Sequence, residues 1–212
     1  MASAAALEGI RVIDFGQYMA GPMAAMMLAD FGADVIRVEP PGGPRLKSAA
    51  NATWNRGKRS IVLDLKTAAD LAIARDLVAS ADVLIENFRP GVMERLGLGE
   101  AAMRKLNPRL IYCAIPGFAH DDPRAAMRAW EGILGAATGC YTTHATVKVD
   151  RPVYNCMPFS SAYGAYLASV AVALALNARA RSGQGQFIEV PLFAATFTAF
   201  SGKAMRVIGE RS

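Results

Sequence analysis

Several polar side chains in this sequence could bind an anion or attack an acyl group. Lys66, Asn87 and Arg89 each come directly after a short apolar run that reads as a strand. Ser160 and Ser161 stand where a long apolar helix should begin. Cationic and amide groups donate hydrogen bonds to phosphates, whereas a serine hydroxyl can cap a helix or act as a nucleophile. The residue types therefore suggest either an anion-binding site or a covalent catalyst.

The elements that must position these residues alternate between strands and helices. Helices are expected at 23–31, from Thr67 onward with Thr67 as N-cap, and at 162–180. This alternation predicts an α/β fold: a Rossmann-like, mostly parallel six-stranded sheet with helices on both faces. Ligands of such sheets bind beyond the carboxyl ends of the strands. The predicted strands are 10–15, 34–39, 60–65, 82–86, 110–115 and 186–190.

Generic motifs do not identify a reaction. The glycine-bearing turn 16–22 matches neither GxGxxG nor a P-loop, and no serine lies in a GxSxG elbow. Acidic residues end several strands, and we expect them to cap or pair at the rim of the sheet rather than to act as acids or bases. These residues are Asp14, Glu39, Asp64 and Glu86.

Composition excludes several classes of protein. The charge of +5 is scattered along the chain, so we expect no nucleic-acid partner. Three widely spaced cysteines predict neither a disulfide framework nor a structural metal site, and they favour a cytoplasmic location. The N-terminus lacks the pattern of a signal peptide. The uncharged run 163–176 is shorter than the ~20 residues of a membrane span, so we expect a buried helix and no membrane partner.

Seven segments carry a more specific signal. In order they are LEGIRVIDF (7–15), AGP (20–22), LADFGADVIRVE (28–39), NRGKRSIVLDLK (55–66), ADVLIENFRPGVMERLG (81–97), NPRLIY (107–112) and SGQGQFIEV (182–190). Each segment alone is weak, but the ordered series covers nearly the whole chain. It resembles the class III CoA-transferase family, which includes formyl-CoA transferase, carnitine CoA-transferase and α-methylacyl-CoA racemase.

The resemblance implies a CoA-binding groove at the ends of the strands. CoA would enter as a substrate, with no prosthetic group and no metal. Lys66, Arg89 and Arg95 are suited to its phosphates, because they supply charge-assisted donors. The implied CoA-binding residues are Met19, Ala20, Leu63, Asp64, Leu65, Lys66, Asn87, Phe88, Arg89 and Arg95, together with Arg128, Ala129 and Trp130.

The catalytic position departs from the family pattern. The resemblance implies an aspartate that attacks acyl-CoA, and its position corresponds here to Ser160 or Ser161. We expect one of these serines to cap the helix instead. Glu131 is a carboxylate in the neighbouring family segment, with positioning as its expected role. Racemases of the family carry a histidine where this chain has Trp130.

The resemblance also sets expectations about size and function. Family members are about twice as long: their large first domain is followed by a small domain and then by a C-terminal segment that returns to complete the first. Residues 1–212 should therefore form a single incomplete version of the large domain, without the other two parts. The implied reaction moves CoA between an acyl-CoA and a small carboxylic acid through an enzyme carboxylate. The alternatives are a catalytically silent acyl-CoA-binding subunit or truncated relic and, more weakly, an acyl-CoA racemase. A homodimer or a partner subunit would supply the missing half.

Overall fold

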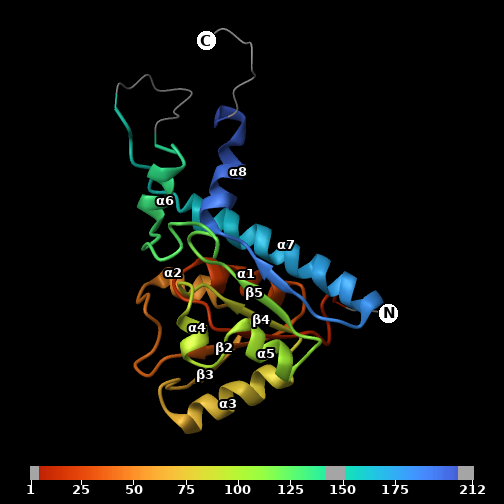
Figure 1. The fold of residues 1–212 in the computed structure, drawn as a ribbon. Helices are drawn as coiled ribbons and strands as arrows, with labels where there is room; N and C mark the ends of the chain where they lie inside the picture. Colours follow the sequence, from red (N-terminus) through yellow and green to blue (C-terminus); the bar gives the residue numbers. More distant parts are fainter. Residues whose placement is uncertain (1–4, 142–150, 205–212) are drawn as a thin grey trace.

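The computed structural model describes residues 5–141 and 151–204. Its centre is a six-stranded sheet in which every neighbouring pair is parallel. The spatial order β3-β2-β1-β4-β5-β6 is that of doubly wound dinucleotide-binding folds (Figure 1). All six predicted strands are confirmed, five of them within one residue at either end, whereas β3 ends three residues earlier than predicted. They are β1 (Arg11–Asp14), β2 (Asp34–Glu39), β3 (Arg59–Val62), β4 (Val83–Glu86), β5 (Ile111–Ala114) and β6 (Phe187–Glu189).

The three predicted helices are also present, with shifted ends. Thr67 caps its helix as expected, because its Oγ1 accepts a hydrogen bond from the backbone N–H of Asp70 at 3.3 Å. The shorter helices and the last one were not predicted. The helices are α1 (Ala20–Asp30), α2 (Ala49–Trp54), α3 (Ala68–Ala79), α4 (Val92–Arg95), α5 (Glu100–Leu106), α6 (Glu131–Ala137), α7 (Phe159–Ser182) and α8 (Leu192–Ala204).

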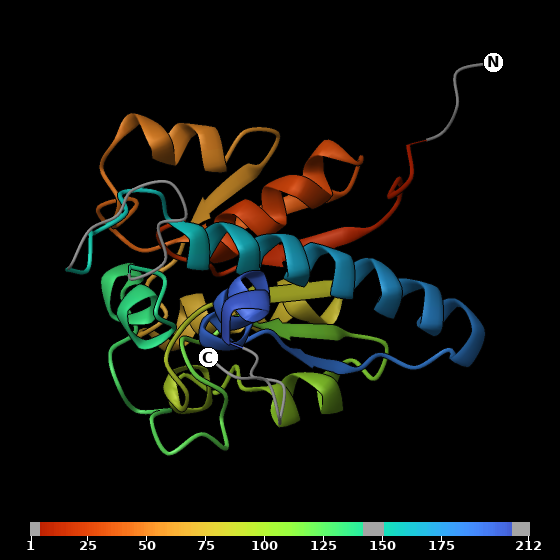
Figure 2. The same cartoon turned by 90° about the horizontal axis from the view of Figure 1, so that it is seen from above.

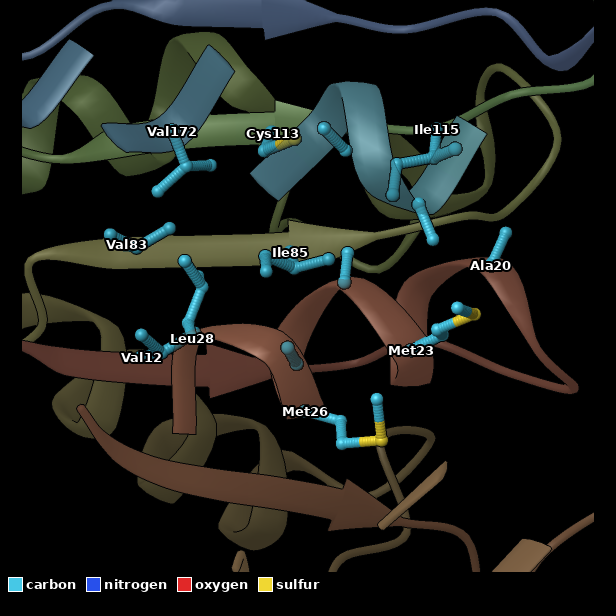
Figure 3. Packing of buried hydrophobic residues seen from close by; sticks show 14 of the residues in the cluster. Val12, Ala20, Met23, Met26, Leu28, Val83, Ile85, Cys113, Ile115 and Val172 are labelled. Atoms are coloured by element: carbon cyan, nitrogen blue, oxygen red, sulfur yellow. The ribbon is translucent and has the colours of Figure 1, made fainter. Parts of the chain in front are cut away.

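Successive strand residues face opposite sides of the sheet, so the chain buries two apolar layers. On one face, α1 and α7 pack on strand residues such as Val12, Val83 and Ile85 (Figure 3). On the other face, α3, α4 and α5 pack on alternate residues such as Ile13 and Leu84. Both faces of the sheet therefore carry helices, as the alternation in the sequence predicts.

The direction in which successive strands are added to the sheet reverses at its centre, between β1 and β4. β1 pairs with β2 on one side and with β4 on the other. The chain first builds outward to β3 and then crosses to β4, β5 and β6. In sheets of this kind the loops after the two central strands separate at such a switch point and leave a crevice for ligands. The turns that follow β1 and β4 are therefore the places to look for a site.

Helix α7 differs from its prediction. It lies beside α1 (Figure 2) and buries Ala168 and Val172 against the core. Val170 and Leu174, however, are 57% and 67% exposed. By length and composition α7 is long and apolar enough to cross a membrane, but core helices pass the same test, and 33% of its apolar window is buried. The expectation of a buried helix is thus right for one face only.

Candidate functional site

An asparagine joins the two turns at the switch point. The backbone N–H of Gln17 donates to Oδ1 of Asn87 at 2.7 Å, and Nδ2 of Asn87 donates to the carbonyl oxygen of Gln17 at 2.9 Å. Glycine is needed at position 21, because a Cβ there would lie 2.8 Å from Gly16 Cα. Asn87, predicted to contact CoA, thus has an observed role in positioning the β1–α1 turn.

Gln17 is a residue that the sequence reasoning did not select. Its side chain is 7% exposed, and its Oε1 atom has no hydrogen-bond partner among the described residues. Met19 and Ala20, which were selected from the same turn, are the N-cap residue and the first residue of α1. The sequence feature that could have identified Gln17 is its position as an amide side chain in a strand-to-helix turn between Gly16 and Gly21.

A buried ion cluster contacts the β1–α1 turn. Lys58 Nζ lies 2.8 Å from Oδ2 of Asp14, and Arg37 Nη1 lies 3.4 Å from the same oxygen. The other oxygen of Asp14 accepts the backbone N–H of Gly16 at 2.7 Å. Arg37 also pairs with Glu39 at 2.9 Å. Burial lowers the pKa of Lys58 despite the opposing attraction of Asp14. Asp14 and Glu39 pair at the sheet rim, as expected.

The segment that leads into α6 lies against the β1–α1 turn. The ring of Trp130 meets that of Tyr18 edge to face, with centroids 5.7 Å apart. Tyr18 has φ +61°, the one positive φ among the described residues other than glycine, so its ring is presented from a strained backbone. Ala129 packs directly over Gly117 in the loop after β5. Residues far apart in sequence are therefore brought to one edge of the sheet.

Gly117→Ala is expected to displace this segment. A Cβ at position 117 would stand 1.9 Å from Cβ of Ala129, which leaves no room for both atoms. We expect a loss of about 1–3 kcal/mol in the free energy of unfolding, measured with urea. The second substitution Ala129→Gly should recover part of the loss. Gly132→Ala is the control, because its Cβ would meet only a ring carbon of Tyr154 at 3.7 Å. An equal loss in both single variants would contradict the close contact.

The carboxylate of Glu131 lies at the N-terminus of α7. Its Oε1 accepts the backbone N–H of Ser160 at 2.6 Å, and its Oε2 accepts the backbone N–H and the hydroxyl of Ser161 at 3.1 and 2.8 Å. The prediction that a serine caps α7 is therefore wrong: the N-cap residue is Pro158, without a side-chain cap, and a carboxylate from 29 residues upstream takes that role. Ser160 is 1% exposed and its Oγ has no described partner.

The segment after β3 lies farther along the same edge. Leu63 is buried, Leu65 is half-buried, and Asp64 accepts the backbone N–H of Lys66 at 3.1 Å, so Asp64 caps the turn as expected. Lys66 is exposed. Strand β3 is three positions from β4 in the sheet, or roughly 14 Å at the usual spacing of strands. Lys66 therefore stands at some distance from the other predicted cations.

Four predicted cations are exposed on or near this edge. Their charged groups make no ion pair or hydrogen bond with any residue of the described ranges 5–141 and 151–204. Phe88 is half-buried, and its backbone N–H donates to the carboxylate of Glu86 at 2.7 Å. This hydrogen bond confirms the capping role expected of Glu86. The four unpaired cations are Lys66, Arg89, Arg95 and Arg128.

The family model for CoA-transferase family III matches residues 7–211. The chain belongs to this family. It is 45% identical over 199 residues to the CoA-transferase/lyase DddD of a Marinomonas species, covering 92% of this chain and 24% of that protein. It is 38% identical to an acetyl-CoA:oxalate CoA-transferase of Acetobacter aceti, covering 96% of this chain and 57% of that protein.

A solved structure supports the same assignment. The crystal structure of a CaiB/BaiF family protein from Brucella suis superimposes with a TM-score of 0.89 at 34% identity, covering 96% of this chain and 57% of that one. This class III chain therefore has the α/β fold of its relatives, and it spans about a quarter to somewhat over half of their lengths.

Proposed function

We propose that this chain is the CoA-binding N-terminal part of a class III CoA-transferase. The observation that carries the proposal is the set of four unpaired cations along this edge of the sheet: Arg89 and Arg95 in the segment after β4, Arg128 before α6, and Lys66 farther along after β3. A cationic side chain without a carboxylate partner is free to bind a phosphate. The relatives named above are CoA-transferases, which fits an acyl-CoA ligand.

The cations suit the shape of CoA. CoA carries a 3′-phosphate and a pyrophosphate at one end and a long, thin acyl-bearing arm at the other. An extended ligand of this kind could run along the sheet edge from Lys66 toward Arg89 and Arg95. The exposed Tyr18–Trp130 pair would then flank the path of the arm to Glu131 and α7. This arrangement orients the thioester without assigning a nucleophile.

We propose that the isolated chain binds acyl-CoA but does not transfer CoA. Serine occupies the position of the expected aspartate. The base that contacts a serine hydroxyl among the described residues is the Glu131 carboxylate, which accepts from Oγ of Ser161 at 2.8 Å, and a carboxylate is a weak base for a hydroxyl. Glu131 is the carboxylate that the structure brings to the serines, and both of its oxygens accept hydrogen bonds from α7. A carboxylate held in this way serves as a cap more readily than as a nucleophile, because attack would break those bonds.

The proposed partner is a second copy of this chain or a partner subunit that supplies the part of the relatives' length that this chain does not span. An apolar groove of about 370 Å³ runs between α7 and α8 and is lined by residues such as Val170, Leu174 and Ala194. An exposed apolar surface of this kind is typical of a protein interface. The acceptor would be a small carboxylic acid, by analogy with the relatives.

Arg89→Ala and Arg95→Ala should each weaken CoA binding about tenfold, because each removes one charge-assisted contact with a phosphate. The measurement is titration calorimetry with CoA at two salt concentrations, and each variant should show a weaker salt dependence than the wild type. Arg181→Ala is the control, since Arg181 is exposed in the last turn of α7, away from the strand ends. If the control weakens binding as much as the two variants do, the proposed site is wrong.

A further inference from the structure

A second cavity, of about 390 Å³, lies where α4 and α5 meet the end of the sheet. Aromatic rings form part of its wall: Phe88, Tyr112 and Phe187 line it, and the rings of the last two have centroids 6.0 Å apart. Four glutamates from four different segments also line it, namely Glu86, Glu94, Glu100 and Glu189. Its size falls within the range of pockets for small ligands.

The cavity holds more negative charge than its surroundings neutralise. None of its lining residues is a lysine or an arginine. Glu100 pairs with Arg104 from outside the lining at 2.6 Å, and Glu189 accepts the ring nitrogen of His120 at 2.9 Å. Glu94 has no ion pair with any residue in the described part of the chain. The acidic groups without a cationic partner are therefore Glu94 and the innermost glutamate.

Glu86 is that innermost glutamate. It is 8% exposed at the carboxyl end of β4 and lines the cavity. Its Oε2 accepts the backbone N–H of Phe88 at 2.7 Å, whereas its Oε1 accepts from none of the described residues. That second oxygen is accessible in the cavity, where a ligand that brings an N–H group could bond to it.

We propose that this cavity binds a small organic cation, an amine or a guanidine on a short apolar stem, with its N–H groups on Glu86 and its stem against the aromatic side chains of the wall. An N–H donor suits the accessible Oε1 atom, because it offers a hydrogen bond as well as a positive charge. The aromatic walls favour a cation with an apolar stem over a hydrated metal ion. The proposal does not depend on CoA binding: Phe88 alone is shared with the residues proposed to contact CoA.

Proton release should accompany the binding. Burial raises the pKa of Glu86 to about 8, and repulsion from Glu94 and Glu189 adds to the shift. A bound cation favours the ionised carboxylate, so near neutral pH the carboxyl loses its proton to the buffer as the cation binds. Affinity should therefore rise as the pH increases toward 9. The titratable and charged groups around the cavity are Glu94, Glu100 with Arg104, Tyr112, His120 and Glu189.

The test uses n-butylguanidinium and its neutral counterpart n-butylurea, titrated into the chain by calorimetry at pH 7 in two buffers of different ionisation enthalpy. We expect n-butylguanidinium to bind with proton release and n-butylurea not to bind. Glu86→Gln, which has the shape of the protonated carboxyl, should weaken binding about tenfold and abolish the proton release. Glu8→Gln, at an exposed glutamate near the N-terminus, should change neither.

Three outcomes would overturn the proposal. They are binding of n-butylurea as tight as that of n-butylguanidinium, unchanged binding by the Glu86→Gln variant, and no binding of the cation at millimolar concentration. A thermal scan confirms that the variant is folded. In the wild type, stability should fall as the pH rises from 4.5 to about 8, because over this interval the unfolded state loses the proton of Glu86 and the folded state keeps it. The Glu86→Gln variant should not show this fall.

Discussion

Asp14→Asn is expected to reduce the free energy of unfolding by about 3–5 kcal/mol, the largest effect that we predict for a single substitution. The side chain of Asp14 is fully buried, and those of Lys58 and Arg37 are 1% and 2% exposed. Removal of the one charge that both cations share leaves two buried positive charges with Glu39 as the remaining carboxylate partner. The penalty arises from these stranded charges rather than from the lost contact itself. Urea unfolding at neutral pH measures it.

Two further variants test this reason. Asp30→Asn removes a carboxylate from a surface pair with Arg56, whose side chains are 41% and 51% exposed, and should cost at most about 1 kcal/mol. Asp14→Asn combined with Lys58→Met removes both a charge and its partner, so it should cost less than Asp14→Asn alone. If Asp14→Asn is as mild as Asp30→Asn, the buried cluster does not hold the β1–α1 turn in solution.

Ser161→Asp is expected to destabilise the protein by about 1–3 kcal/mol at pH 7.5, although it introduces the residue type expected from the family pattern. The new carboxylate would replace a hydroxyl that donates to Glu131 at 2.8 Å. Two carboxylates at this distance cannot both stay ionised at low cost, so the pKa of one must rise. The loss should therefore shrink at pH 4.5, where one of the two binds a proton.

Glu131→Gln supplies the test of this coupling. Alone, it weakens the cap on the backbone N–H groups of Ser160 and Ser161 and should cost about 1 kcal/mol. In its presence, Ser161→Asp should become nearly neutral, because an aspartate on the first turn of α7 then meets an amide instead of a charge. Ser161→Ala is the control for loss of the hydroxyl. Equal costs of Ser161→Asp with and without Glu131 would show that the two side chains do not meet.

The strands of the sheet could be predicted because each is a short run of apolar residues bounded by turn residues. Both faces of this sheet are covered, so the runs are nearly continuous in Val, Ile and Leu, as in β4. Thr67 could be predicted as a cap because its partner lies three residues away. The short helices α2 and α4, of six and four residues, carry too little periodicity to be recognised.

The contacts that assemble the site could not be predicted, because they join residues distant in sequence. Asn87 meets Gln17 across 70 positions, and Glu131 meets Ser160 across 29. Local rules assign a serine at a helix start to capping, and they give no reason to expect a carboxylate from another segment. The resemblance to a known family named the segments that meet, but not the atoms that join them.

One measurement decides most directly whether this chain binds acyl-CoA without reacting with it. The chain is incubated with an acyl-CoA, and the same sample is then measured by mass spectrometry under native and under denaturing conditions. We expect the native spectrum to show a complex with one acyl-CoA and the denaturing spectrum to show the unmodified chain. A covalent acyl or CoA adduct in the denaturing spectrum that disappears in the Glu131→Gln variant would contradict this expectation and make Glu131 the nucleophile.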